Sequence, residues 1–245
     1  MRKYILLSIL LVLLLALTVW MTAIKTAGIF DMAPPRKVLT AALRHLQIVG
    51  LAEGLAVLIG VPLGFVLTRR SIRYISPVLV GTANMGQTIP TLAFIGIAGA
   101  ALGLGFNAAV VALMVYAVLP IVRNTYAGIK SVDPAVIEAA TGMGMSRRQI
   151  IFRIELPLAM PVMIAGIRTS TVVNVGTAAV AGMIGAGGLG ELIITGIAVS
   201  VTELILQGAA PTAMLAITLD ALLEGFERVI TPRGLALAKA AQRQQ

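Results

Sequence analysis

The chain has 245 residues, of which 58% are hydrophobic and 12% are charged. Soluble domains usually carry about 25% charged residues, so this composition is typical of a membrane protein. Cysteine is absent and His45 is the single histidine, so we expect no metal site and no thiol or histidine-based catalysis. The net charge of +9 comes from residues that lie between apolar runs, and this pattern argues against a nucleic-acid partner.

Apolar segments predict six membrane-spanning helices. The first, residues 5–24, has no charged side chain. At about 1.5 Å per residue it covers a hydrocarbon core of about 30 Å. It is longer than the roughly 7 to 15 apolar residues of a signal peptide, so we predict that it is retained. The other spans are predicted over residues 46–68, 74–122 (two spans, divided near 103–107), 156–184 and 204–223.

The basic residues predict the orientation of these spans, because cytoplasmic loops are enriched in Lys and Arg. With both termini in the cytoplasm, fourteen of the 19 Lys and Arg residues lie on the cytoplasmic side. Arg168 falls inside the fifth span, and four basic residues lie in outer loops: Lys25, Arg36, Lys37 and Arg44. The same topology places His45 in an outer loop and residues 133–157 in the cytoplasm.

The cytoplasmic segment 133–157 begins with a helix-start signal. Asp133 is a preferred N-cap residue, and Pro134 suits the first helical position, where its missing N–H costs nothing. We predict a short helix that ends near Ala140, with Gly142 and Gly144 forming the turn after it.

A second short helix is predicted to follow this turn. Ser146 and Gln149 have the spacing of a capping box, in which each side chain bonds the other residue's backbone N–H. Pro157 is expected to end this helix, because proline is poorly tolerated in helix interiors.

Seven residues of this segment form a spaced pattern: Glu138, Ala139, Ala140, Gly144, Ile154, Leu156 and Pro157. The pattern is similar to the loop found in permease subunits of bacterial ABC importers. Four further stretches resemble permeases that import osmoprotectants such as glycine betaine, choline or carnitine: QTIPTLA (87–93), LPIVRNTYAGI (119–129), AGIRTSTVVNVGTAAVAGMIGAGGLG (165–190) and ERVITP (227–232). The resemblance covers residues 46–232.

The resemblance implies an all-α integral membrane protein with the fold of a type I ABC importer permease, and a transport subunit rather than an enzyme. In that family the loop docks on a cytoplasmic ATPase. Glu138 would face the ATPase, Ala139 and Ala140 would allow close helix approach, and Gly144 would supply the turn.

The resemblance to that family also implies partners and domains for this chain. One such loop per chain implies two ATPase subunits and a second permease, either a copy of this chain or a relative. An extracytoplasmic binding protein and the lipid of the bacterial inner membrane complete the set of partners. The implied domains are an N-terminal helix with its outer loop (1–45), a transmembrane domain (46–227) and a cytoplasmic tail (228–245).

No nucleotide site is predicted in the chain itself. A P-loop needs Gly, four residues, then Gly-Lys-Ser or Gly-Lys-Thr, which the sequence lacks, so ATP and Mg²⁺ are expected on the partner ATPase. GAGGLG at 185–190 satisfies the dinucleotide pattern, but it follows a predicted span rather than a strand. The next acidic residues, Glu191 and Glu203, have the wrong spacing. We interpret these glycines as a turn and expect no cofactor.

Three ionisable residues fall inside predicted spans: Glu53, Arg168 and Asp220. Charged groups at this depth usually pair with one another or line a functional path. Glu53 and Arg168 are predicted at similar depths and Asp220 nearer the cytoplasm. We favour a structural ion pair between helices, of Arg168 with Glu53 or Asp220, over direct contact with a solute.

Uncharged polar residues on the third and fifth spans have two interpretations. They are Asn84, Gln87, Thr88, Thr91, Asn174 and Thr177. Polar side chains hydrogen-bond between membrane helices, and they also line routes for ions and solutes. Both interpretations remain open. Pro90 is predicted to break or kink the third span.

Other functions are weighed against osmoprotectant import. A permease of the same superfamily for another small solute, such as an amino acid or a sulfonate, is the main alternative. An intramembrane protease would need a His-Glu-x-x-His helix or a serine with a partner base, and the single histidine serves neither. A secondary transporter fits the composition but would not need the segment at 133–157.

Overall fold

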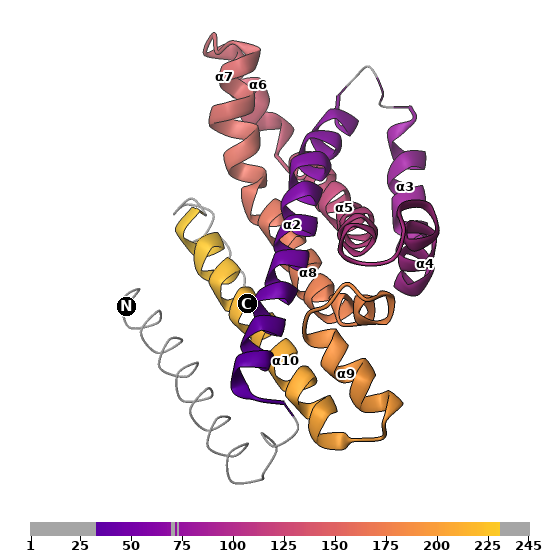
Figure 1. Cartoon of the computed structure of the whole chain (residues 1–245). Helices are drawn as coiled ribbons and strands as arrows, with labels where there is room; N and C mark the ends of the chain where they lie inside the picture. Colours follow the sequence, from indigo (N-terminus) through magenta and orange to yellow (C-terminus); the bar gives the residue numbers. More distant parts are fainter. Residues whose placement is uncertain (1–32, 70–71, 73, 231–245) are drawn as a thin grey trace, which may run out of the picture. The chain divides into compact units, whose positions relative to one another are not determined.

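The computed structural model describes residues 33–69, 72 and 74–230, and every regular element in this part of the chain is helical (Figure 1). The predicted first span, residues 5–24, lies outside the described residues. In chain order the α-helices are α2 (Pro35–Leu67), α3 (Ser76–Gly86), α4 (Thr91–Leu102), α5 (Phe106–Lys130), α6 (Pro134–Gly142), α7 (Arg147–Ile150), α8 (Leu156–Ala178), α9 (Leu189–Ala198) and α10 (Thr202–Ile230). A π-helical stretch, Ile151–Glu155, joins α7 to α8, and a short 3₁₀ helix, Val180–Ile184, follows α8.

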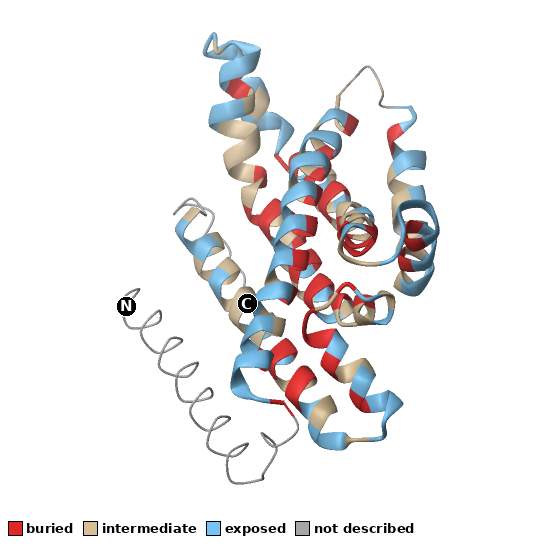
Figure 2. Cartoon of the chain, in the orientation of Figure 1, coloured by how far each residue is buried: buried red, intermediate tan, exposed pale blue. Residues whose placement is uncertain are grey.

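Four helical segments of the described chain are long and apolar enough to cross a membrane. They are Pro35–Leu67, Phe106–Lys130, Arg147–Ala178 and Thr202–Ile230. Figure 2 shows long exposed stretches on these helices, and many of the exposed residues are apolar, including Leu58, Ile217 and Val229. Large exposed apolar faces are unusual for a soluble monomer and are expected where lipid replaces water.

Helix α2 begins eleven residues before the predicted second span, so Arg36, Lys37, Arg44 and His45 are helical and not in a loop, while their place on the outer side stays a prediction. All four lie inside this helix. A span predicted from apolar residues starts where the charges stop, whereas a helix starts at a conformational signal. Pro35 at the first helical position is that signal here.

The third predicted span is two helices rather than one. Helix α3 ends at Gly86 and α4 begins at Thr91, after Pro90 in an extended conformation with φ −57° and ψ 132°. Proline disfavours helical geometry in the residue before it, so the break falls where the sequence predicted it. The division of 74–122 near 103–107 is also confirmed, because α4 ends at Leu102 and α5 begins at Phe106.

The described residues form two compact units, each with its own packing. The first unit contains residues up to Gly54, Ile89–Tyr116 and Thr171–Leu222, and the second contains Leu55–Thr88, Ala117–Ser170 and residues from Leu223 onward. Helices α2, α5, α8 and α10 each contribute residues to both units.

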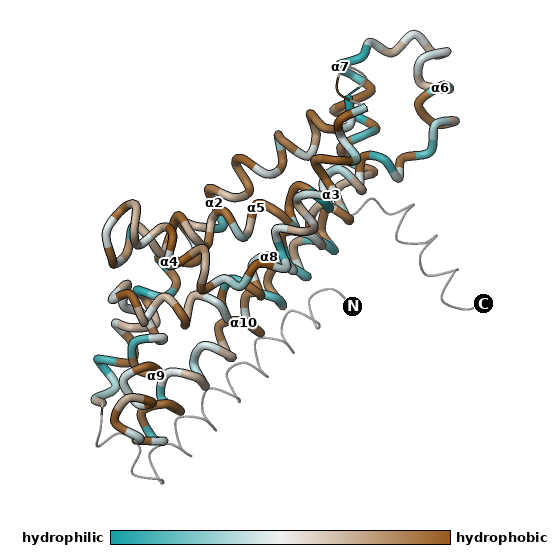
Figure 3. Tube along the Cα trace, turned by 90° about the vertical axis from the view of Figure 1, so that its right-hand side faces the viewer, coloured by the Kyte–Doolittle hydropathy of each residue, from teal (hydrophilic) through white to brown (hydrophobic). Residues whose placement is uncertain are grey.

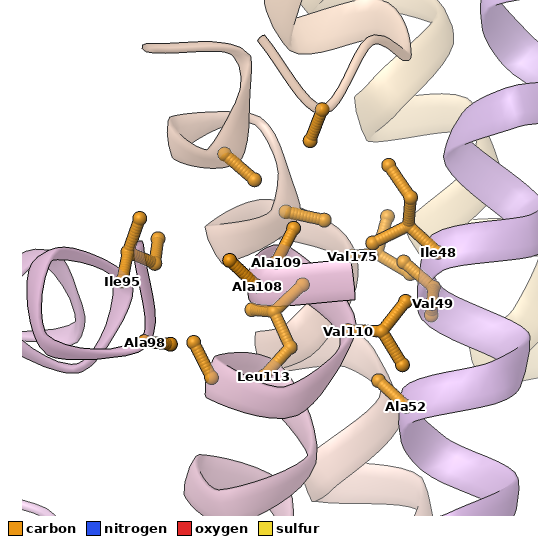
Figure 4. Packing of buried hydrophobic residues seen from close by; sticks show 14 residues of the cluster. Ile48, Val49, Ala52, Ile95, Ala98, Ala108, Ala109, Val110, Leu113 and Val175 are labelled. Carbon is orange, nitrogen blue, oxygen red and sulfur yellow. The ribbon is translucent and has the colours of Figure 1, made fainter. Parts of the chain in front are cut away.

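The core of the first unit is built from small side chains. Figure 4 shows α2, α4, α5 and α8 converging on alanines and β-branched residues, with Leu113 of α5 at the centre. Ala52, Ala108 and Ala109 are fully buried. Small residues let membrane helices approach closely, which compensates for the weak hydrophobic drive between helices in lipid.

The core of the second unit lies around the end of α5 and the start of α8. Ile129, Val132, Ala159 and Met163 are buried there, and Phe65 of α2 and Ile137 of α6 pack against them. This cluster holds α6, through Ile137, against the longer helices.

The glycine-rich segment after α8 contains a helix, α9, that was not predicted. Gly185, Gly187 and Gly188 have positive φ angles and form the predicted turn. Gly190, in the first turn of α9, passes so close to the segment before it that a Cβ atom there would lie 2.0 Å from the carbonyl oxygen of Ala179. The spacing that resembles a dinucleotide motif therefore serves a turn and a backbone crossing.

Candidate functional site

The first half of segment 133–157 folds as its capping residues predict. Asp133 is extended, and its Oδ1 accepts the N–H of Ala135 at 2.9 Å, so it caps α6. The N–H of Met145 donates to the Ala140 carbonyl at 3.1 Å, and the N–H of Gly144 donates to the Thr141 carbonyl at 2.9 Å. This bond pattern is a Schellman motif, and Gly144 takes its left-handed position with φ +79°. Helix α6 ends at Gly142, two residues beyond the prediction.

The second half begins with the predicted capping box. The N–H of Ser146 bonds Gln149 Oε1 at 2.8 Å, and the N–H of Gln149 bonds Ser146 Oγ at 3.4 Å. Both bonds satisfy backbone donors that the first turn of α7 leaves free.

The prediction that Pro157 ends this helix is wrong, because the helix continues through Pro157 into α8. Ile151–Glu155 is π-helical, and the N–H of Leu156 bonds the carbonyl of Ile151, five residues back. Proline in a normal α-helix clashes with the carbonyl four residues earlier. The wider π turn directly before Pro157 relieves that crowding and lets the helix pass.

The seven pattern residues divide into an exposed and a packed group. Glu138, Ala139 and Gly144 are exposed, whereas Ala140 is 1% exposed and packs inward. Ile154, Leu156 and Pro157 are half-buried at the base of the segment. The pattern therefore combines a surface with the residues that anchor it.

The two most exposed large apolar residues of the same segment were not predicted as site residues. Met143 is 74% exposed and Phe152 is 65% exposed. Figure 3 shows both hydrophilic and hydrophobic positions along α6 and α7. Exposed Met and aromatic side chains with a polar rim are typical of protein-docking surfaces. Both residues lie in the most polar run of the central sequence, and an apolar residue in such a run was the signal that could have identified them.

Glu53 and Asn174, in the first unit, are joined by a hydrogen bond. Asn174 is fully buried, and its Nδ2 donates to Glu53 Oε2 at 2.9 Å and to the Leu113 carbonyl at 3.4 Å. Glu53 is 8% exposed. The three residues come from α8, α2 and α5, so Asn174 connects three helices. This is the helix-to-helix bonding that was one of its two interpretations, while a place on a translocation path stays a prediction.

Arg168, in the second unit, has acidic partners on α10. Its Nη2 lies 3.1 Å from Glu224 Oε2 and its Nη1 lies 3.9 Å from Glu227 Oε2. Arg228 pairs with the other oxygen of Glu224. Arg168 thus takes part in an interhelical ion-pair network, as a structural role predicts. Its predicted pairing with Glu53 or Asp220 stays a prediction.

The remaining candidate path residues are spread over both units. Thr88 is exposed and its hydroxyl bonds the Met85 carbonyl at 2.7 Å, while Thr177 bonds the Val173 carbonyl at 3.0 Å. Gln87 and Thr91 are half-buried, and Asn84 lies on α3. These hydroxyl bonds stay within one turn of helix, so they do not test a path.

We expect Asn174→Leu to destabilise the protein by about 1 to 2 kcal/mol, between the values for neutral membrane hydrogen bonds and charge-assisted ones. The buried Glu53 carboxyl loses a donor, and leucine supplies none. Thermal unfolding in detergent measures this change. Thr177→Val, which removes only a bond within α8, is the matched control and should change stability less. Unchanged stability together with altered solute affinity would favour the path interpretation instead.

The fold and this site define an integral membrane protein with a structured polar segment suited to docking another protein. Comparison with known families makes the class specific: a family model described as binding-protein-dependent transport system inner membrane component matches residues 60–234. The chain therefore belongs to this family of ABC importer permeases.

Individual relatives share most of their length with this chain. The osmoprotectant import permease protein OsmY of Salmonella typhimurium is 41% identical over 225 residues, which is 92% of this chain and 94% of that protein. The glycine betaine/carnitine/choline permease OpuCB of Bacillus subtilis is 44% identical over 191 residues, 78% of this chain and 87% of that one.

Solved structures of ABC transporters match the fold of this chain. An inward-facing structure of the MetNI methionine ABC transporter has a TM-score of 0.69 at 22% identity and covers 80% of this chain and 97% of that one. At that identity the match shows the fold, which is that of a type I importer permease.

Proposed function

We propose that this chain is the membrane subunit of an ATP-driven importer for quaternary-amine osmoprotectants, such as glycine betaine, choline or carnitine. The observation that carries the proposal is the identity of 41% and 44% with permeases named for these solutes, over most of both chains. The alternative of an amino acid or sulfonate permease receives no such support, since the methionine transporter matches at 22% identity.

The energy is supplied by a separate ATPase that binds ATP and Mg²⁺ and docks on segment 133–157. The absence of a P-loop sequence and the exposure of Glu138, Met143 and Phe152 support this part of the proposal. Two ATPase subunits, a second permease and an extracytoplasmic binding protein complete the importer. Both termini lie in the cytoplasm of a bacterium, as the distribution of basic residues predicts.

Solute uptake tests the proposal. Cells with and without the gene are given labelled glycine betaine, choline or carnitine at low and high osmolarity, with methionine and a sulfonate as comparison solutes. We expect gene-dependent accumulation of at least one quaternary amine and none of the comparison solutes. Uptake of methionine or the sulfonate alone would favour the alternative. Equal uptake of every solute in both strains would contradict the proposal.

A further inference from the structure

An ion pair connects segment 133–157 to the end of α2 within the second unit. Arg69 Nη2 lies 2.7 Å from Glu155 Oε2, although the two residues are 86 positions apart in sequence. Their side chains are 20% and 12% exposed. A charge pair this close and this shielded is screened far less than a surface pair.

Arg69 is held in place from the α2 side. It follows the end of α2 by two residues, and its N–H bonds the Val66 carbonyl at 3.0 Å. Its guanidinium carbon lies 4.0 Å from the centroid of the Phe65 ring, a cation–π contact. Phe65 in turn packs against the buried cluster at the start of α8. A displacement of the Arg69 head group is therefore transmitted to the last turn of α2.

Glu155 lies at an irregular point of the helix that joins α7 to α8. It is the last residue of the π-helical stretch, where the normal hydrogen-bond ladder between α7 and α8 is interrupted. Helices bend most readily at such interruptions, so a push on α6 and α7 would be partly absorbed there. The ion pair of Glu155 with Arg69 connects the π-helical stretch to the end of α2 and so limits this bending.

The pair is a single contact rather than a fork. Among the described residues, the hydrogen bond between the two side chains runs from Arg69 Nη2 to Glu155 Oε2, and the buried Nε of Arg69 has no partner. One contact keeps the two helices connected while allowing the angle between them to change. A single contact of this kind suits a connection that changes its angle better than one that fixes it.

We infer that the Arg69–Glu155 pair is a transmission contact, through which movement of α6 and α7 displaces the end of α2. Neither residue belongs to the seven-residue docking pattern. The inference rests on the proposed function, in which an ATPase moves this segment. It makes Arg69 and Glu155 positioning residues that set how much transport each ATP cycle produces, not how tightly the ATPase binds.

The test compares solute transport with ATP hydrolysis in liposomes that contain the complete importer. For Glu155→Gln and Arg69→Gln we expect the solute moved per ATP to fall at least about 5-fold, the lower end of usual coupling between sites. Co-purification of the ATPase should stay unchanged. The charge-swapped double variant Arg69→Glu/Glu155→Arg should recover most of the ratio, and Arg69→Lys should be intermediate.

Arg228→Gln, which breaks an exposed ion pair on α10 in the same unit, is the matched control and should keep the normal ratio. A lower melting temperature with an unchanged solute-to-ATP ratio in the single variants would show a merely structural pair and overturn the inference. Failure of the double variant to recover would do the same. If the unsubstituted importer neither binds the ATPase nor couples uptake to ATP, the proposed function itself fails.

Discussion

Replacing Gly190 with alanine is expected to prevent most of the protein from accumulating in a folded form. A Cβ at this position would lie 2.0 Å from the Ala179 carbonyl oxygen and 2.6 Å from its carbon. Both are backbone atoms, so no side chain can turn away, and α9 would have to move. Overpacking that side chains can accommodate costs about 1 to 3 kcal/mol, and we expect this substitution to exceed that range.

Size-exclusion chromatography of a fluorescent fusion in detergent measures the loss, as a smaller monodisperse peak and a lower melting temperature. Gly176→Ala is the matched control, because a Cβ added to this exposed glycine of α8 would meet no neighbouring atom within 4 Å. Alanine in a helix interior is roughly 0.5 to 1 kcal/mol more favourable than glycine, so this variant should be at least as stable as the parent. Normal accumulation of Gly190→Ala would show that α9 does not cross so closely.

Gly190 also shows why part of the fold escaped prediction. The sequence identified GAGGLG as a glycine cluster and predicted the turn, because positive φ angles are a local property of glycine. It did not predict the crossing with Ala179 or the helix that follows. A glycine that is needed because a neighbouring segment passes close by cannot be told, from the sequence alone, from a glycine that is needed for a positive φ angle.

Local signals predicted the candidate site best. Asp133, Ser146 and Gln149 form their capping hydrogen bonds with residues at most three positions away, and these caps are present as predicted. Pro157 follows an equally local rule, yet the helix runs through it. The π-helical stretch directly before Pro157 widens the turn there, and a rule for regular α-helices does not include such a turn.

The sequence did not predict that Glu53 contacts Asn174 or that Arg168 contacts Glu224. Glu53 and Arg168 were each recognised as costly in a membrane, which follows from their charge alone. The structure joins Glu53 to Asn174 and Arg168 to Glu224. Pairing depends on which helix faces which, and span boundaries carry errors of a few residues, enough to rotate a side chain to another face. Hydropathy predicts the depth of these charges, but it carries no information on which neighbouring helix each of them faces.

Replacing Glu138 with lysine is expected to abolish most ATP-driven uptake while leaving the permease in the membrane. Glu138 is exposed on α6 and is not among the residues that cap or pack that helix, so the fold should tolerate lysine. In the proposed importer this carboxylate faces the ATPase. Loss of a desolvated interfacial charge pair costs about 2 to 5 kcal/mol, which corresponds to a fall in affinity of about 30-fold or more.

Uptake, membrane abundance and co-purification of the ATPase are measured on the same cells. Glu203→Lys, the same charge change at an exposed position of α10, is the control for insertion and abundance and should transport normally. Loss of uptake together with loss of the ATPase would place Glu138 at the docking surface. Loss of uptake with the ATPase still bound would instead place Glu138 in transmission, beside Arg69 and Glu155. Normal uptake would contradict a docking role for this residue, and the exposed Met143 and Phe152 would then be the groups to vary.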